Sequence, residues 1–245
     1  MGELIAVLSG KGGTGKTSVC AGLATALAQA GHRVLCIDCD IGLRNLDIAL
    51  GLSETSPISF LDVCRGDYQL TDALKHPMFP ELYFLTAPVN CRSDQIDRTA
   101  FSCMLRQARE EFKYVFLDAP AGIELGFSLC ASYADRVLLV TNPEPSAIRD
   151  ASRAGEALEL MGKSDVRLII NRIGKKMLAA MDLTVDDIMD DAGLPLLGII
   201  PEDPNVTLAA SFEVPLLRQS RRGAAAACRR IAKRIQGQKV PVPFR

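Results

Sequence analysis

Short, uniformly apolar segments alternate along the chain with longer segments in which apolar residues recur every three or four positions. The short segments predict β-strands that are buried on both faces, because a half-exposed strand would alternate apolar and polar residues. We expect seven such strands, at Leu4–Leu8, Val34–Ile37, Leu82–Leu85, Tyr114–Leu117, Val137–Thr141, Val166–Ile170 and Leu197–Ile200.

The longer segments predict helices between these strands. A helix over 16–30 would carry its apolar residues on one face and end before Gly31. Further helices are expected over 97–112 and 146–161, and another is expected to begin at Thr184, a candidate N-cap residue. Strands that alternate with helices in this way are typical of βαβ units and a parallel sheet.

The first strand leads directly into a glycine-rich segment with the pattern Gly-x-x-x-x-Gly-Lys-Thr. Between a strand and a helix, this pattern is typical of a phosphate-binding loop, in which backbone N–H groups and the positive end of the helix face an anion. We expect Lys16 to contact the β- and γ-phosphates and the Thr17 hydroxyl to bind Mg²⁺. The candidate nucleotide-binding residues of this loop are Gly10, Lys11, Gly12, Gly13, Thr14, Gly15, Lys16, Thr17 and Ser18.

The fold class that follows is a single-domain α/β P-loop NTPase. Its sheet should be twisted, mostly parallel and seven- to eight-stranded, with helices on both faces, over residues 1–237, followed by a short tail over 238–245. Ligands of such sheets bind at the carboxyl ends of the strands. Polar residues follow the expected strands at this edge, at Asp38, Asp40, Asp118, Asn142, Asn171, Arg172, Glu202 and Asp203.

Three of these aspartates predict a magnesium site. Asp118 follows an apolar strand, which is the Walker B arrangement of a carboxylate near Mg²⁺. Asp38 and Asp40 are two positions apart, so an extended segment would turn both toward the metal. We assign Asp38 to the water shell of Mg²⁺ and Asp40 to orienting the attacking water; alternatively, one of them only caps the helix that follows. The N–H group of Gly122 is expected near the γ-phosphate.

Lys11 is the unusual residue of the loop, because phosphate binding does not require a second lysine there. Its side chain can act in trans on the nucleotide of a facing subunit, as an arginine finger does. We therefore predict a homodimer that forms with ATP and hydrolyses it to ADP and phosphate. In this interpretation Lys11, Lys16 and Asp40 are catalytic, and Thr17, Asp38 and Asp118 hold Mg²⁺.

Composition and charge narrow the function classes. The 245 residues carry a net charge of −1, so no global basic field indicates a nucleic-acid partner. The eight cysteines form no paired metal-binding array, although Cys36 and Cys39 keep an iron–sulfur cluster open as an alternative. With no secretory signal and no membrane-spanning apolar stretch, we expect a cytoplasmic protein with reduced thiols.

The segment Lys11–Thr17 resembles the deviant Walker A motif of the ParA/MinD ATPase superfamily. Within that superfamily, Asp38–Asp47 and Asp118–Glu124 are similar to the switch I and switch II segments of the MinD family. Three shorter segments match in order and spacing, and the resemblance covers nearly the whole chain. These segments are 141–144, 170–172 and 200–203.

The resemblance implies roles for residues beyond the phosphate loop. Adenine would be contacted by Asn171 and Arg172, joined by the loop of Pro201, Glu202 and Asp203. Arg44, Asn45 and the segment 146–150 would form the surface recognised by MinC- and MinE-like proteins. The ATP-bound form would sit peripherally on the anionic inner face of the cell membrane. A ParA-like DNA-partitioning ATPase and a FlhG-like regulator of flagellar number remain alternatives.

The C-terminal segment departs from the family, whose members usually end in a lipid-binding amphipathic helix. Residues 224–235 place small apolar residues on one face and basic residues opposite, which favours a last core helix with a solvated basic face. The alternative is an interfacial membrane helix. Pro241 and Pro243 preclude a regular helix through the tail, so the expected lipid helix is not visible.

Overall fold

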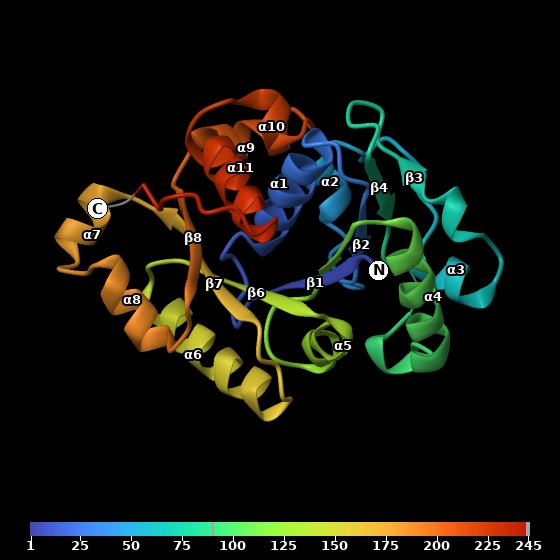
Figure 1. Cartoon of the computed structure of the whole chain (residues 1–245), viewed down its shortest axis with the longest axis horizontal. Coiled ribbons are helices and arrows are strands. Elements are labelled where there is room, and N and C mark those ends of the chain that lie inside the picture. Colours follow the sequence, from blue (N-terminus) through green and yellow to red (C-terminus); the bar gives the residue numbers. More distant parts are fainter. Residues whose placement is uncertain (90, 244–245) are drawn as a thin grey trace.

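The structure is a computed structural model that describes residues 1–89 and 91–243; Phe244 and Arg245 of the predicted tail lie outside the described residues. Within those ranges, eight strands form one sheet at the centre of the molecule (Figure 1). They are β1 (Glu3–Leu8), β2 (Val34–Asp38), β3 (Leu74–Lys75), β4 (Leu82–Leu85), β5 (Tyr114–Asp118), β6 (Arg136–Thr141), β7 (Val166–Ile173) and β8 (Leu196–Pro201).

The order of the strands is β3-β4-β2-β5-β1-β6-β7-β8, so the first strand occupies the middle of the sheet. Neighbouring strands are parallel except β3, which pairs antiparallel with β4. The predicted mostly parallel α/β fold is therefore confirmed. All seven expected strands are present, while β3 was missed because two residues are too few to show a period.

Helices cover both faces of the sheet (Figure 1). The predicted helices are present, with ends shifted by one or two residues, and Thr184 forms the expected capping box at the start of α8. The helices are α1 (Lys16–Gln29), α2 (Leu46–Leu50), α3 (Phe60–Arg65), α4 (Arg98–Glu111), α5 (Leu125–Tyr133), α6 (Pro145–Leu160), α7 (Lys175–Ala180), α8 (Val185–Ala192), α9 (Pro204–Ser211), α10 (Leu216–Gln219) and α11 (Gly223–Ile235).

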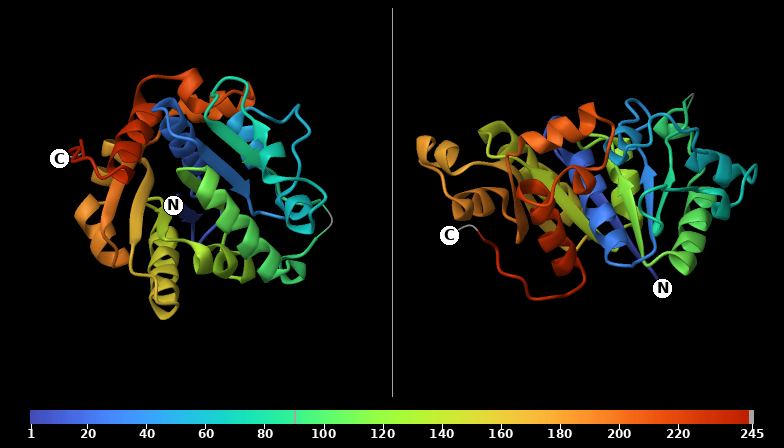
Figure 2. Two further views of the ribbon diagram at one scale, coloured as in Figure 1. Left: turned by 45° about the vertical axis from the view of Figure 1, so that its right-hand side comes forward. Right: turned by 90° about the horizontal axis from the view of Figure 1, so that it is seen from above.

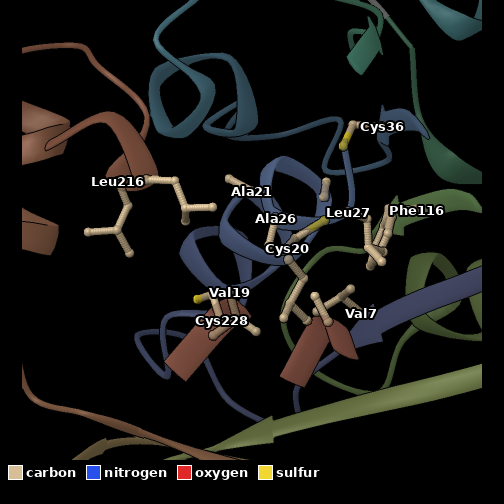
Figure 3. Packing of buried hydrophobic residues seen from close by; sticks show 14 of the residues in the cluster. Val7, Val19, Cys20, Ala21, Ala26, Leu27, Cys36, Phe116, Leu216 and Cys228 are labelled. Carbon is tan, nitrogen blue, oxygen red and sulfur yellow. The ribbon is translucent and has the colours of Figure 1, made fainter. Parts of the chain in front are cut away.

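One face of the sheet packs against α1, α2, α9, α10 and α11. Val7 and Phe116 from the sheet, Val19 and Cys20 from α1, and Cys228 from α11 belong to one buried cluster (Figure 3). The apolar side of α11 is part of this core, as predicted, and its buried residues include Ala224, Ala227, Ile231 and Ile235. The alternative of an interfacial membrane helix is therefore wrong, because the apolar side of α11 is already covered.

The opposite face packs against α3, α4, α5 and α6, and α6, α7 and α8 enclose a smaller cluster at the β8 end. Two helices, α5 on this face and α2 on the other, have no clear sequence period. The α5 helix is apolar nearly all round, and α2 has only five residues, so neither shows a single apolar stripe. Across 1–89 and 91–243, no helix combines the length and apolarity needed to cross a lipid bilayer.

The tail after α11 folds back along β8, the last strand of the sheet. The Arg234 guanidinium donates hydrogen bonds to the carbonyl oxygens of Val240 (2.8 Å), Pro241 (2.7 Å) and Leu197 in β8 (2.9 Å). Val242 packs against the cluster formed by α6, α7 and α8. Arg234 and Val242 thus hold the tail against the edge of the sheet.

We predict that Asp203→Ala lowers the free energy of unfolding by roughly 1–3 kcal/mol. The Asp203 carboxylate accepts 2.9 Å hydrogen bonds from the N–H groups of Asn205 and Ala224, so one side chain caps both α9 and α11. Urea denaturation monitored by circular dichroism measures the change. Asp67 is exposed, and Asp67→Ala is the matched control, with an expected effect below about 0.5 kcal/mol. Equal effects of the two substitutions would contradict the double cap.

Candidate functional site

The phosphate loop lies at the carboxyl edge of the sheet, between the central strand β1 and α1. Gly13 and Gly15 have φ angles of +82° and +84°, a left-handed conformation that favours glycine. Gly10 is packed so closely on α6 that a Cβ atom there would lie 2.2 Å from the Asp150 carbonyl oxygen. The glycines therefore both shape the loop and let it approach the neighbouring elements.

Lys16 and Asp118 meet beneath this loop. Lys16 Nζ lies 2.6 Å from Asp118 Oδ1, and the two side chains are only 6% and 1% exposed. Burial would lower the pKa of Lys16, but the Asp118 carboxylate outweighs burial and the pKa is raised. The predicted phosphate-binding lysine and Walker B aspartate are thus brought together by β1, α1 and β5.

Unpaired polar atoms surround the same loop. Among the described residues, the buried side-chain oxygen and nitrogen atoms without a hydrogen-bond partner are Ser9 Oγ, Thr14 Oγ1 and Asp118 Oδ2. Such atoms are costly to bury unless a ligand or water satisfies them. The unpaired carboxylate oxygen is Asp118 Oδ2, and the Thr17 hydroxyl beside it accepts a 3.3 Å contact from Lys16 Nζ. A carboxylate and a hydroxyl oxygen suit a hard cation such as Mg²⁺. The residues present therefore fit a nucleotide with its magnesium ion.

Asp38 and Asp40 lie beside Asp118 but differ in their contacts. Asp38 is buried, and its carboxylate accepts hydrogen bonds from the N–H groups of Asp40 (2.9 Å) and Leu46 (3.3 Å). The chain therefore turns after Asp38 and does not continue extended as we expected. Asp38 also caps the start of α2, as the alternative proposed. Burial, followed by the charge of Asp118, raises the pKa of Asp38 to about 7.

The two predicted switch segments are held to the rest of the protein by hydrogen bonds. The Gly122 N–H donates to the Ser9 carbonyl oxygen at 3.1 Å, so it is not free for a phosphate in this conformation. Arg44 has a φ of +48° and donates to Thr86 Oγ1 at the end of β4, at 3.1 and 3.2 Å. Nothing in the sequence indicated Thr86, because no local pattern links it to Arg44.

Lys11 extends away from the Lys16–Asp118 pair toward the start of α6. Its Nζ atom lies 3.0 Å from Glu144 Oε2 and 2.8 Å from Ser146 Oγ. The Lys11 ammonium lowers the pKa of Glu144. Exposed ion pairs of this kind are weak, so a stronger acceptor can displace them. Lys11 thus contacts the start of α6, where the family resemblance implies that partner proteins are recognised.

Asn171 holds the phosphate loop from the side. Its amide Nδ2 donates a 2.8 Å hydrogen bond to the Thr14 carbonyl oxygen, and a Cβ atom on Gly15 would lie 2.3 Å from the same nitrogen. The amide that we expected at adenine is therefore engaged by the loop. Asn171 belongs to β7, whose register with β8 is irregular between Ile170 and Ile173, so Asn171 lies at a bulge.

A pocket beside the loop is suited to a nucleoside base. It lies between the start of α1, the ends of β7 and β8, and the starts of α9, α10 and α11. The expected residues are all present, and Val206, Thr207 and Leu216 were missed because they lie in helices with no motif. The pocket is lined by Gly15, Ser18, Val19, Asn171, Arg172, Ile200, Pro201, Glu202, Asp203, Val206, Thr207, Leu216, Ala224 and Cys228.

Within this pocket, two of the predicted base-contacting residues are already paired. Arg172, which has a φ of +58°, contacts Glu202 Oε2 through its Nε atom at 2.9 Å. Both side chains are more than half exposed, so a ligand can separate them. Asp203 also lines the pocket, and its carboxylate caps α9 and α11.

The cysteines do not form a metal site. Cys36 belongs to the core cluster on the α1 face of the sheet, and Cys39 belongs to the cluster on the other face. In the described ranges, no group of three or more Cys, His, Asp or Glu side chains is placed to hold a metal ion. The iron–sulfur alternative is therefore not supported.

A central phosphate loop, a Walker B aspartate and an adjoining pocket at one sheet edge are typical of P-loop nucleotide-binding proteins of the deviant Walker A class. Residues 5–216 match the family model of the CobQ/CobB/MinD/ParA nucleotide binding domain. The chain is 39% identical over 247 residues to the septum site-determining protein MinD of Bacillus subtilis, covering 99% of this chain and 92% of that protein. It belongs to the MinD family of septum site-determining proteins.

Solved structures agree with this assignment. The MinC:MinD cell division protein complex of Aquifex aeolicus superimposes with a TM-score of 0.90 at 37% identity, covering 98% of each chain. MinD of Pyrococcus horikoshii, solved with Mg-ADP, superimposes with a TM-score of 0.84 at 30% identity over 96% of each chain. The Mg-ADP of that structure is the kind of ligand that the unpaired polar atoms of this site fit.

We predict that Asn171→Ala weakens the binding of Mg-pyrophosphate as well as that of Mg-ADP, each by about two- to tenfold. The lost hydrogen bond to Thr14 would free the phosphate loop, and pyrophosphate has no base for Asn171 to contact. Isothermal titration calorimetry measures both affinities. Arg172→Ala is the control, because it should weaken ADP alone. If Asn171→Ala left pyrophosphate binding unchanged, its role in the loop would be wrong.

The stability of the metal-free protein should depend on pH through Asp38. Because the pKa of Asp38 is raised in the folded state, from 3.8 to about 7, the folded protein binds more protons than the unfolded chain between these values. Stability of the metal-free protein should therefore fall as the pH rises from about 4 to 7, and Asp38→Asn should flatten this slope. Thermal melts across this range test it, with the exposed Asp67→Asn as control. An unchanged slope in Asp38→Asn would contradict it.

Proposed function

We propose that this protein is an ATPase switch that dimerises on binding Mg-ATP and brings a MinC-like division inhibitor to the membrane. Hydrolysis, stimulated by a MinE-like partner, would release it. The observation that carries the proposal is the position of Lys11, outside its own phosphate site and able to leave Glu144 and Ser146. A lysine in that position suits a composite site completed by a second subunit.

Each residue of the site would have its own role in ATP hydrolysis. Bound magnesium would supply charge neutralisation at the phosphates. Lys16 would exchange Asp118 for phosphate oxygens, which leaves the Asp118 carboxylate available to the metal together with Thr17. Asp40, which is less buried than Asp38, would orient the attacking water. Turnover of the isolated protein should be slow, because positioning of the water depends on a partner.

The same movement would connect nucleotide binding to the partner surface. When Lys11 leaves Glu144 and Ser146, the first turn of α6 loses a cationic contact and gains a facing subunit. Arg44 and Asn45 belong to the switch segment that adjoins the site. We assign the surface formed by these residues and 146–150 to MinC- and MinE-like proteins. The membrane role places the ATP-bound form at the inner face of the cell membrane, with residues 1–237 as the ATPase domain.

We predict that Lys16→Ala abolishes ATP-dependent dimerisation, because the phosphates lose their buried cation. Asp40→Ala should retain the ATP dimer and lose hydrolysis by at least about a hundredfold. Light scattering after gel filtration measures the dimer, and phosphate release measures turnover. Lys75→Ala, which removes an exposed lysine of β3, is the matched control. A dimer that is indifferent to Lys16→Ala would rule out the switch.

Partner choice is tested with the trapped Asp40→Ala dimer of the full chain, offered MinC and DNA in separate experiments. Binding of MinC that requires ATP would support the proposal. Binding of DNA with steep salt dependence, together with no binding of MinC, would instead favour a ParA-like partitioning ATPase.

A further inference from the structure

The segment that carries Asp38 and Asp40 has little regular structure of its own. It turns after β2 and leads into α2, whose five residues would not form a stable helix in isolation. Contacts with the rest of the protein must therefore fix its position. One such contact lies at the start of α2, where the Asp38 carboxylate accepts a 3.3 Å hydrogen bond from the Leu46 N–H group.

The side chain of His76 holds the other end of α2. Leu50, the last residue of the helix, is buried, and its carbonyl oxygen accepts a 2.8 Å hydrogen bond from His76 Nε2. The N–H groups of Gly51 and Leu52 bond to earlier carbonyl oxygens of the helix. Because a buried carbonyl group without a partner is costly, the end of α2 depends on the histidine.

The contacts of the His76 ring define its protonation state. Its Nδ1 atom accepts hydrogen bonds from the N–H groups of Met78 (3.0 Å) and Phe79 (3.3 Å). Backbone N–H groups only donate, so the ring proton is on Nε2 and is donated to Leu50. The ring is 1% exposed, and burial lowers the pKa of His76, which favours the neutral form. One neutral ring therefore joins the turn after β3 to the end of α2.

The β3–β4 hairpin carries a second contact to the same segment. His76 directly follows β3, and its N–H group donates to the Leu82 carbonyl oxygen at the start of β4, at 2.8 Å. Thr86 directly follows β4 and accepts the two hydrogen bonds from Arg44. Figure 1 and Figure 2 show α2 beside this edge of the sheet. The hairpin thus holds both the switch I segment and α2.

We propose that His76 is a positioning residue for ATP hydrolysis, which fixes α2 and, through it, the segment that carries Asp38 and Asp40. Five residues of helix span about 7.5 Å, so a displacement at Leu50 would reach Leu46 and the Asp38 carboxylate within two turns. The proposal rests on the proposed function for the reaction itself. The alternative is that His76 only stabilises the turn formed by residues 76–79.

Two substitutions separate these roles, because each retains one half of the ring. His76→Gln places an amide nitrogen near the position of Nε2 and can still donate to Leu50. His76→Asn places an amide oxygen near the position of Nδ1 and can still accept from Met78 and Phe79. Phe101→Leu is the control for lost stability, because Phe101 is fully buried in α4 on the other face of the sheet.

The first measurement is hydrogen exchange of the full chain without nucleotide, followed by mass spectrometry. Amides of residues 46–52 should exchange at least about tenfold faster in His76→Asn than in the unmodified chain. His76→Gln should stay within about threefold of the unmodified chain. Phe101→Leu should lower the melting temperature without this local change.

The second measurement is phosphate release over a range of ATP concentrations. In His76→Asn, kcat should fall by about ten- to hundredfold while KM changes by less than about twofold, because the carboxylates are misplaced and the phosphate loop is intact. In His76→Gln and in Phe101→Leu, kcat should stay within about threefold of the unmodified chain.

Equal effects of the two His76 substitutions, or a larger effect of His76→Gln, would overturn the positioning role and leave only the turn. A kcat loss in Phe101→Leu as large as that in His76→Asn would do the same. If the unmodified chain did not hydrolyse ATP, the proposed function would fail and the positioning role with it. Equal exchange in the two His76 variants, beside normal hydrolysis by the unmodified chain, would overturn the assignment of His76 alone.

Discussion

The 2.6 Å contact between Lys16 Nζ and Asp118 Oδ1 joins the first turn of α1 to the end of β5 in the buried centre of the sheet. Removing one partner of such a buried pair leaves an uncompensated charge, which typically costs about 3–5 kcal/mol. The two residues that we expect to serve nucleotide and metal therefore also hold the site together. The remaining Asp118 oxygen has no partner within the described residues, so a ligand or a water molecule is needed to satisfy it.

The conformation of the phosphate loop depends on elements that lie far from it in the sequence. Asn171 at the end of β7 binds the Thr14 carbonyl oxygen, and the Asp150 carbonyl of α6 leaves room only for glycine at position 10. Lys11 contacts α6 as well. A movement of the phosphate loop would therefore reach the pocket and α6 directly, because residues of both contact the loop.

Charge is divided between two parts of the same compact fold. Asp38 and Asp118 lie side by side at the ends of β2 and β5, and the arginines and lysine of α11 lie on the outer helical layer. Net charge reports only the sum, so the near-neutral total was a poor guide to the surface. The near-neutral net charge argued against a polyanionic partner, whereas the folded protein carries basic residues together on α11.

Local patterns in the sequence determined the seven longer strands, the main helices, the phosphate loop and the Walker B aspartate, because each is defined by residues adjacent in the chain. The strand β3, with two residues, and the helix α2, with five, were not predicted, because so few positions show no period. Only the tertiary structure decided that Asn171 holds the loop, that Asp38 caps α2 and that Lys11 rests on α6. Those contacts join residues up to 157 positions apart, and packing alone selects which distant partner each polar group meets.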